Sequence, residues 1–209
     1  MSRFSKYFLM KEGDICEYIR DQLPDYFAAN ASVTVKEIGD GNLNYVFRAV
    51  EKSDLSADKS GDKSEGKSII VKQAGEQLRI SAAMRITTDR NRIESEILII
   101  QDKYAPGLVP KIFKYDTVMC ACLMEDLSDH RLMRYALMEH QIFPKFAEDV
   151  TTYMVNTLLN TTDVVMEHKE KKALVKSFIN PELCEITEDL IYTEPYNDAK
   201  GRNIVTPEN

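Results

Sequence analysis

The fold of this protein is decided by SIIVKQA (residues 68–74) and by TTDRNRIESEILIIQDKY (residues 87–104). The first run is rich in β-branched residues, which predicts a strand with Lys72 near its end. The second run opens with Thr and Asp, residues that commonly begin helices. Its apolar residues recur at helical spacing, at Ile93, Ile97, Ile100 and Tyr104. We therefore expect a strand, a loop through Thr87 and then an amphipathic helix.

More strands lie on both sides of this pair. A short amphipathic helix is predicted at residues 11–23, and the β-rich runs Val33–Ile38 and Tyr45–Val50 predict a hairpin. Two further strands are predicted within KIFKYDTVMCACLMEDL (residues 111–127), around a turn at Asp116. Residues 51–67 are too polar to bury apolar surface, so we expect a flexible surface loop there.

The chain changes character after Asp126, where only helical patterns follow. They occupy residues 131–140, 144–160, 166–178 and 182–192. The order of elements predicts an α+β, protein-kinase-like fold: a five-stranded antiparallel N-lobe sheet with one inserted helix, a hinge and an incomplete helical C-lobe. The expected boundaries are 1–124 for the nucleotide-binding N-lobe, 125–128 for the hinge and 129–209 for the partial C-lobe.

Composition excludes several classes of partner. The 209 residues carry a net charge of −7 and a sequence pI of about 5.1, which disfavours nucleic acid and anionic membranes as partners. The sequence shows no signal peptide and no run of about 18 apolar residues. The four cysteines form no CxxC pair, as is typical of a reducing cytoplasm. We expect a cytoplasmic protein.

Three features point to a nucleotide, each with a simpler structural alternative. The turn GDGNLN (residues 39–44) contains Gly41, and glycine allows backbone N–H groups to approach phosphate; an ordinary hairpin turn explains it equally well. Lys72 resembles the strand lysine that pairs with ATP phosphates in kinases, or it simply reaches solvent. Glu94 and Glu96 are candidates to orient Lys72; we favour Glu94 and expect Glu96 on a solvated face.

The third feature is ACLMEDLS (residues 121–128), an apolar strand that ends in two acidic residues where the helical half begins. A kinase hinge binds adenine through backbone groups, here the carbonyl of Glu125 and the N–H of Leu127. The side chain of Asp126 is then free to cap the next helix. Ordinary strand-end chemistry is the alternative for this segment.

The same segments resemble S-methyl-5-thioribose kinase, a relative of aminoglycoside and choline kinases. The resemblance is carried by EIGDGNLNYVF, IIVKQA, DRNRIESE, LMEDLS and FINPELCEITEDLIYTEPY, and it covers most of residues 30–198. It implies ATP contacts at Asn44, Lys72, Glu125, Asp126 and Leu127. It also implies Mg²⁺-dependent transfer of phosphate from ATP to the 1-hydroxyl of methylthioribose in methionine salvage. A homodimer is the expected assembly of the intact enzyme.

The family's catalytic loop, His-Gly-Asp-Leu-His, and its Asp-x-Glu metal motif are both missing from the sequence. His130, His140 and His168 lie in helical patterns, and none introduces such a loop. We therefore assign no catalytic residue and no metal ligand, and expect a truncated chain that is inactive alone. The chain also has no Trp, which leaves the family's substrate-binding aromatic loop without a counterpart after Lys72.

Two other interpretations stay open. The first is a complete, non-catalytic module of kinase-like fold that binds a nucleotide or another protein. The second is an α+β protein without a nucleotide site, in which the turn glycines and Lys72 are purely structural.

Overall fold

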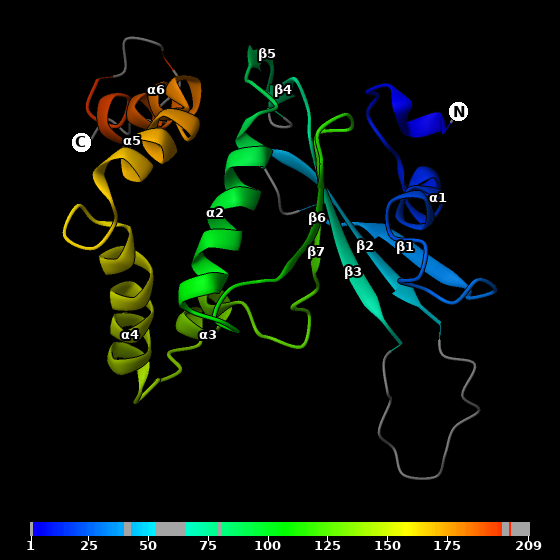
Figure 1. Ribbon diagram of the computed structural model, residues 1–209, viewed down its shortest axis with the longest axis horizontal. Helices are drawn as coiled ribbons and strands as arrows, with labels where there is room; N and C mark the ends of the chain where they lie inside the picture. The colour runs from blue at the N-terminus through cyan, green and yellow to red at the C-terminus, as the bar shows by residue number, and fades with distance from the viewer. Residues whose placement is uncertain (1, 40–42, 53–65, 79–80, 198–200, 202–209) are drawn as a thin grey trace.

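A five-stranded antiparallel sheet forms the centre of the N-terminal half (Figure 1). The computed structural model describes residues 2–39, 43–52, 66–78, 81–197 and 201. The strand order is β1-β2-β3-β7-β6. The strands are β1 (Val33–Glu37), β2 (Asn44–Glu51), β3 (Ser68–Ala74), β6 (Ile112–Asp116) and β7 (Ala121–Glu125). This confirms the predicted five strands and the α+β class. Most of the predicted loop at 51–67 lies outside the described residues.

Helices cover the two faces of this sheet, α1 (Glu12–Gln22) on one and α2 (Arg90–Tyr104) on the other (Figure 1). The side chains of β3 alternate as a strand requires: Ile69, Val71 and Gln73 are buried, whereas Ile70 and Lys72 are half-buried. Ile69 and Val71 belong to the core shared with α1, so Ile70 and Lys72 point to the opposite face.

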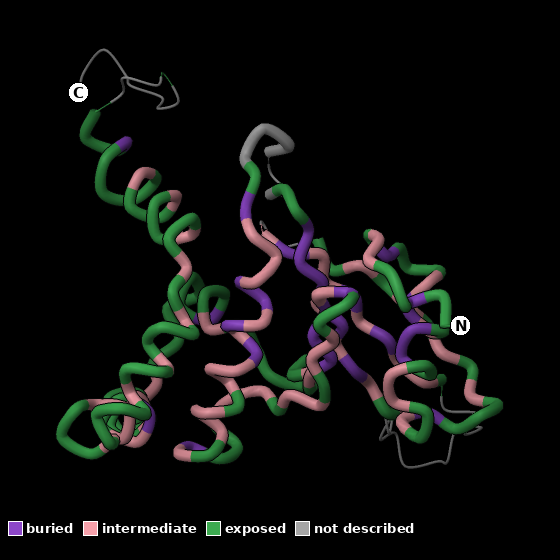
Figure 2. The backbone as a smooth tube through the Cα atoms, turned by 45° about the horizontal axis from the view of Figure 1, so that its top comes forward, coloured by how far each residue is buried: buried purple, intermediate pink, exposed green. Residues whose placement is uncertain are grey.

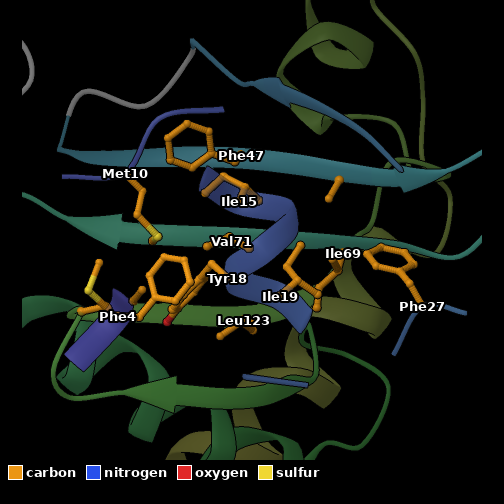
Figure 3. Packing of buried hydrophobic residues seen from close by; sticks show 13 residues of the cluster. Phe4, Met10, Ile15, Tyr18, Ile19, Phe27, Phe47, Ile69, Val71 and Leu123 are labelled. Carbon is orange, nitrogen blue, oxygen red and sulfur yellow. The ribbon is translucent and has the colours of Figure 1, made fainter. Parts of the chain in front are cut away.

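The main core lies between α1 and the sheet. Figure 3 shows Ile15, Tyr18 and Ile19 of α1 against Val71 and the neighbouring strands. Each fully buried side chain of this size stabilises the fold by about 1.5–3 kcal/mol. The Tyr18 hydroxyl donates a hydrogen bond to Asp116 Oδ2 at 3.1 Å, so the buried polar end is satisfied. Burial, followed by the charge of Asp116, raises the pKa of Tyr18 above its usual range.

The prediction of a plain loop between β3 and α2 was wrong. This connection contains a two-stranded antiparallel sheet of β4 (Gln77–Leu78) and β5 (Ser81–Arg85). A two-residue strand gives too little alternation to be recognised in a sequence. The β4–β5 pair thus shortens the irregular part of the connection between β3, which carries Lys72, and α2.

All four predicted C-terminal helices are present. They are α3 (Met133–Met138), α4 (Phe146–Leu158), α5 (His168–Ser177) and α6 (Pro181–Glu188). A 3₁₀ turn at Leu159–Thr161 follows α4, and a π-helical turn at Asp189–Thr193 follows α6. Another 3₁₀ turn lies near the N-terminus, at Arg3–Ser5. Two histidines depart from the prediction, because His130 and His140 lie in loops, the latter with a φ of 58°.

The C-terminal helices bury little of their apolar surface. Among the described residues, most of the exposed large apolar side chains lie between 132 and 196. Figure 2 shows the backbone leading to the C-terminus largely in the green of exposed residues. A cavity of about 610 Å³ opens between α2, α4, α5 and α6, with Ile97, Leu174 and Phe178 among its lining residues. In the described part of the chain, no helix combines the length and apolarity needed to cross a membrane.

Candidate functional site

The candidate site lies on the sheet face opposite α1, where two rows of side chains cross three strands. Lys72 pairs directly with Val46 of β2 and with Cys122 of β7. One step along the strands, Ile70 pairs with Arg48 and with Met124. Directly opposed residues share a face, so a lysine and several apolar side chains form one surface.

The lysine on this surface is held by an ion pair. Lys72 Nζ donates to Glu94 Oε1 of α2 at 2.5 Å, and the two side chains are 23% and 38% exposed. Glu96 instead accepts a hydrogen bond from Arg92 at 2.8 Å. The structure therefore brings Lys72 together with Glu94 and directs Glu96 elsewhere. Both charges remain reachable by a ligand, because neither side chain is buried.

The predicted hinge is tied to β2 by a buried carboxylate. The Asp126 side chain is 4% exposed, and its Oδ2 accepts a hydrogen bond from Arg48 Nε at 2.5 Å. Burial by itself raises the pKa of Asp126, but hydrogen bonds from Arg48, Ser68 and Ser128 and the charge of Arg48 outweigh it. The pKa therefore falls below the ordinary value.

The side chain of Asp126 does not cap the next helix. Its Oδ1 accepts from the N–H of Ser128 at 3.1 Å, which closes a short turn, and α3 begins only at Met133. The other two hinge candidates lie at the end of β7 and just after it. Glu125 ends that strand, and its N–H donates to the carbonyl of Lys111 at 2.8 Å. The carbonyl of Leu127 accepts from the N–H of His130 at 2.9 Å.

The turn between β1 and β2 is described only at its ends. Gly41 lies outside the described residues. Asn44 is the first residue of β2, and its Oδ1 accepts a hydrogen bond from Arg90 Nε at 3.0 Å. Sequence reasoning missed Arg90, which is 4% exposed. The sequence does indicate that Arg90 is buried, because Arg90 stands three residues before Ile93 on the same helical stripe.

Sequence reasoning also missed Arg48 and the apolar residues Val46, Ile70 and Met124. They share the Lys72 face by strand register, which a sequence shows only once the pairing of strands is known. Within the described residues, no group of three His, Cys, Asp or Glu side chains is arranged to hold a metal ion.

Comparison with known proteins confirms the resemblance found in the sequence. The chain is 36% identical over 200 residues to the methylthioribose kinase of Yersinia pseudotuberculosis serotype O:1b, which covers 95% of this chain and 46% of that protein. The methylthioribose kinase of Bacillus velezensis is 40% identical over 173 residues, 82% of this chain and 41% of the relative. That of Cronobacter sakazakii is 37% identical over 200 residues, 95% of this chain and 47% of the relative.

The match thus extends along nearly the whole chain, yet the chain spans about half the length of these curated relatives. No protein-family model matches the sequence.

Proposed function

We propose that this chain is the N-terminal, nucleotide-binding portion of a methylthioribose kinase. The observation that carries the proposal is the ion pair between Lys72 and Glu94 on the sheet face opposite α1. Kinases bind ATP phosphates with a lysine on a strand, and a glutamate on a helix holds that lysine extended. The resemblance of the surrounding segments to methylthioribose kinases supports the same assignment.

The ammonium of Lys72 would contact the α- and β-phosphates, while Glu94 keeps the side chain extended toward them. The turn through Gly41 and Asn44 would supply backbone N–H groups to the same phosphates. Because Lys72 keeps about a quarter of its side chain exposed, a ligand reaches it without unfolding any described element.

The adenine ring would lie further along the sheet, toward the 125–128 segment. Val46, Ile70 and Met124 offer apolar side chains on this face, which suits the flat faces of a purine. The backbone of Glu125 and Leu127 would form the hydrogen bonds to its edge. The ion pair of Arg48 with Asp126 holds that backbone against β2, so Asp126 would position the hinge through its side chain.

The reaction proposed for the whole protein is phosphorylation of the 1-hydroxyl of methylthioribose, with ATP and a small sugar as ligands. Mg²⁺ would supply neutralisation of phosphate charge, and its ligands and the catalytic aspartate would lie in the portion of the relatives that this chain does not match. The residues present here bind and orient the nucleotide. They provide positioning and electrostatic stabilisation, which dominate phosphoryl transfer.

Calorimetric titration with Mg-ATP tests this function. We expect saturable binding by the wild-type chain and at least a tenfold loss of affinity in Lys72→Ala, because a charged contact to phosphate is removed. Lys103→Ala serves as the control, since Lys103 lies on α2 at the far end from Glu94 and contacts Tyr104. A folded wild-type chain that gives no heat with Mg-ATP refutes the proposal.

A further inference from the structure

The segment DRNRIESE (residues 89–96) contains a residue that the proposed function does not yet use. Arg90 opens α2, is 4% exposed and directs its guanidinium into the protein. Its four hydrogen bonds to described residues all go to uncharged oxygens. Nε donates to Asn44 Oδ1 at 3.0 Å, Nη1 to the carbonyl of Thr87 at 2.6 Å, and Nη2 to the carbonyls of Leu43 and Gly75 at 2.9 Å each.

These acceptors belong to three separate segments of the chain. Leu43 directly precedes β2 and Asn44 begins it, Gly75 directly follows β3, and Thr87 precedes α2. Asn44 and Ala74 are direct partners in the sheet, so the guanidinium sits at the end of the β2–β3 pair, next to the β1–β2 turn. One buried side chain therefore fixes the spacing of the turn, the lysine strand and the glutamate helix.

The next residue strengthens this connection. Asn91 Nδ2 donates to the carbonyl of Lys72 at 2.7 Å and to the carbonyl of Cys120 at 3.0 Å. The first turn of α2 is thus bonded to the backbone of the lysine itself. Glu94 lies one helical turn later on the same helix, so the position of its carboxylate depends on these anchors.

Among the described residues no carboxylate is hydrogen-bonded to Arg90, although the charges of Glu94 and Glu182 favour its protonated form. A buried cation held by neutral acceptors is costly to keep, which suggests a role beyond stability. Desolvation lowers the pKa of Arg90, yet arginine keeps its proton in proteins. Its planar fork of five donors serves four acceptors in fixed directions, whereas a lysine has three donors on a flexible stem. The charge also lies beside the turn at which phosphate would bind.

We infer that Arg90 is a positioning residue for the nucleotide phosphates, which it serves by fixing β2, β3 and α2 at one point. This inference rests on the proposed nucleotide-binding function. It goes beyond that function because it makes one buried residue, Arg90, responsible for the positions of the groups that would contact the phosphates. The affinity for adenosine, which lacks phosphates, should not depend on Arg90.

Calorimetry with Mg-ATP and with adenosine, on wild type, Arg90→Gln and Arg90→Lys, tests the inference. Both variants should bind Mg-ATP at least tenfold more weakly and bind adenosine within about twofold of wild type. Arg92→Gln is the matched control: Arg92 lies on the same helix turn, bonds Asp89, Glu96 and Ser177, and should change neither affinity.

Hydrogen exchange in the free protein provides a second measurement that needs no nucleotide. In Arg90→Lys, the amides of residues 43–46 and 73–76 should exchange faster, and those of β6 should not. If Arg90→Gln fails to fold, Arg90→Lys and Asn44→Ala take its place; the latter removes one acceptor and should weaken Mg-ATP by a few-fold only.

Two results overturn the inference: unchanged Mg-ATP affinity in folded Arg90 variants, or equal losses for Mg-ATP and adenosine. The second would mean that Arg90 merely supports the fold. A wild-type chain that binds neither ligand refutes the proposed function instead, so the two failures are told apart by the wild-type titration alone.

Discussion

Replacing Arg48 with Met should destabilise the protein by about 2 kcal/mol at neutral pH. The substitution keeps an unbranched, mostly apolar stem but leaves the carboxylate of Asp126, 4% exposed, without its cation. Breaking a fully buried ion pair by removing one partner costs about 3–5 kcal/mol. Arg48 is 27% exposed, so water screens part of that cost, and the remaining bonds from Ser128 retain some of the stabilisation.

The effect should depend on pH in a definite direction. The folded-state pKa of Asp126 is lowered from 3.8, so the stability it contributes is present above that ordinary value and is lost as the pH falls below it. In Arg48→Met, burial is no longer outweighed by the guanidinium, so the pKa of Asp126 should rise. The difference in stability between wild type and variant is therefore largest at pH 7 and shrinks toward pH 3.

Urea unfolding of wild type, Arg48→Met, Asp126→Asn and the double variant gives the coupling energy of the pair. We expect about 1–2 kcal/mol at pH 7. Arg92→Met is the control, because its partners Asp89 and Glu96 are nearly half exposed and should contribute less than about 1 kcal/mol. A coupling near zero at pH 7, or one that does not fall in acid, would refute the argument.

Three other outcomes follow from the structure. Glu94→Gln should weaken Mg-ATP less than Lys72→Ala in calorimetry, since it loosens the lysine but leaves its charge; an equal or larger loss would contradict an orienting role. Tyr18→Phe should lower the free energy of unfolding by about 1 kcal/mol in urea titration, the worth of its bond to Asp116; no change would mean that the bond contributes nothing. The exposed apolar side chains of residues 132–196 should bind a hydrophobic dye and promote concentration-dependent self-association in sedimentation, whereas a monomer with no dye signal would contradict this.

Much of the fold was predictable because local patterns and tertiary packing agree. The stripe through Ile93 and Ile97 predicts α2, in which Ile93 is buried and Ile97 half-buried, and the alternation around the buried Val71 predicts β3. The β4–β5 hairpin escaped prediction because β4 has only two residues, too few for a period to show. The loop positions of His130 and His140 were not predicted, because a helix boundary shifts by several residues at little cost in free energy.

The candidate site was predictable only in part, and the division has a physical cause. Lys72 and Glu94 carry charges at positions that strand and helix spacing relate to one another, so a pairing could be expected. Arg48 and Asp126 lie 78 residues apart, and their contact depends on strand order. Arg90 lies on the apolar stripe of α2, which hints at its burial, but only the packed structure reveals its bonds to Leu43, Asn44, Gly75 and Thr87.

The central claim is that Lys72 faces a bound adenine nucleotide, and site-resolved acylation tests it most directly. An acyl-phosphate derivative of ATP transfers its acyl group to a lysine beside the phosphates, and peptide mass spectrometry then identifies that lysine. We predict dominant labelling of Lys72 that excess Mg-ATP suppresses, with Lys103 and Lys114 labelled weakly and without competition. Labelling spread over surface lysines and unaffected by Mg-ATP would contradict the account.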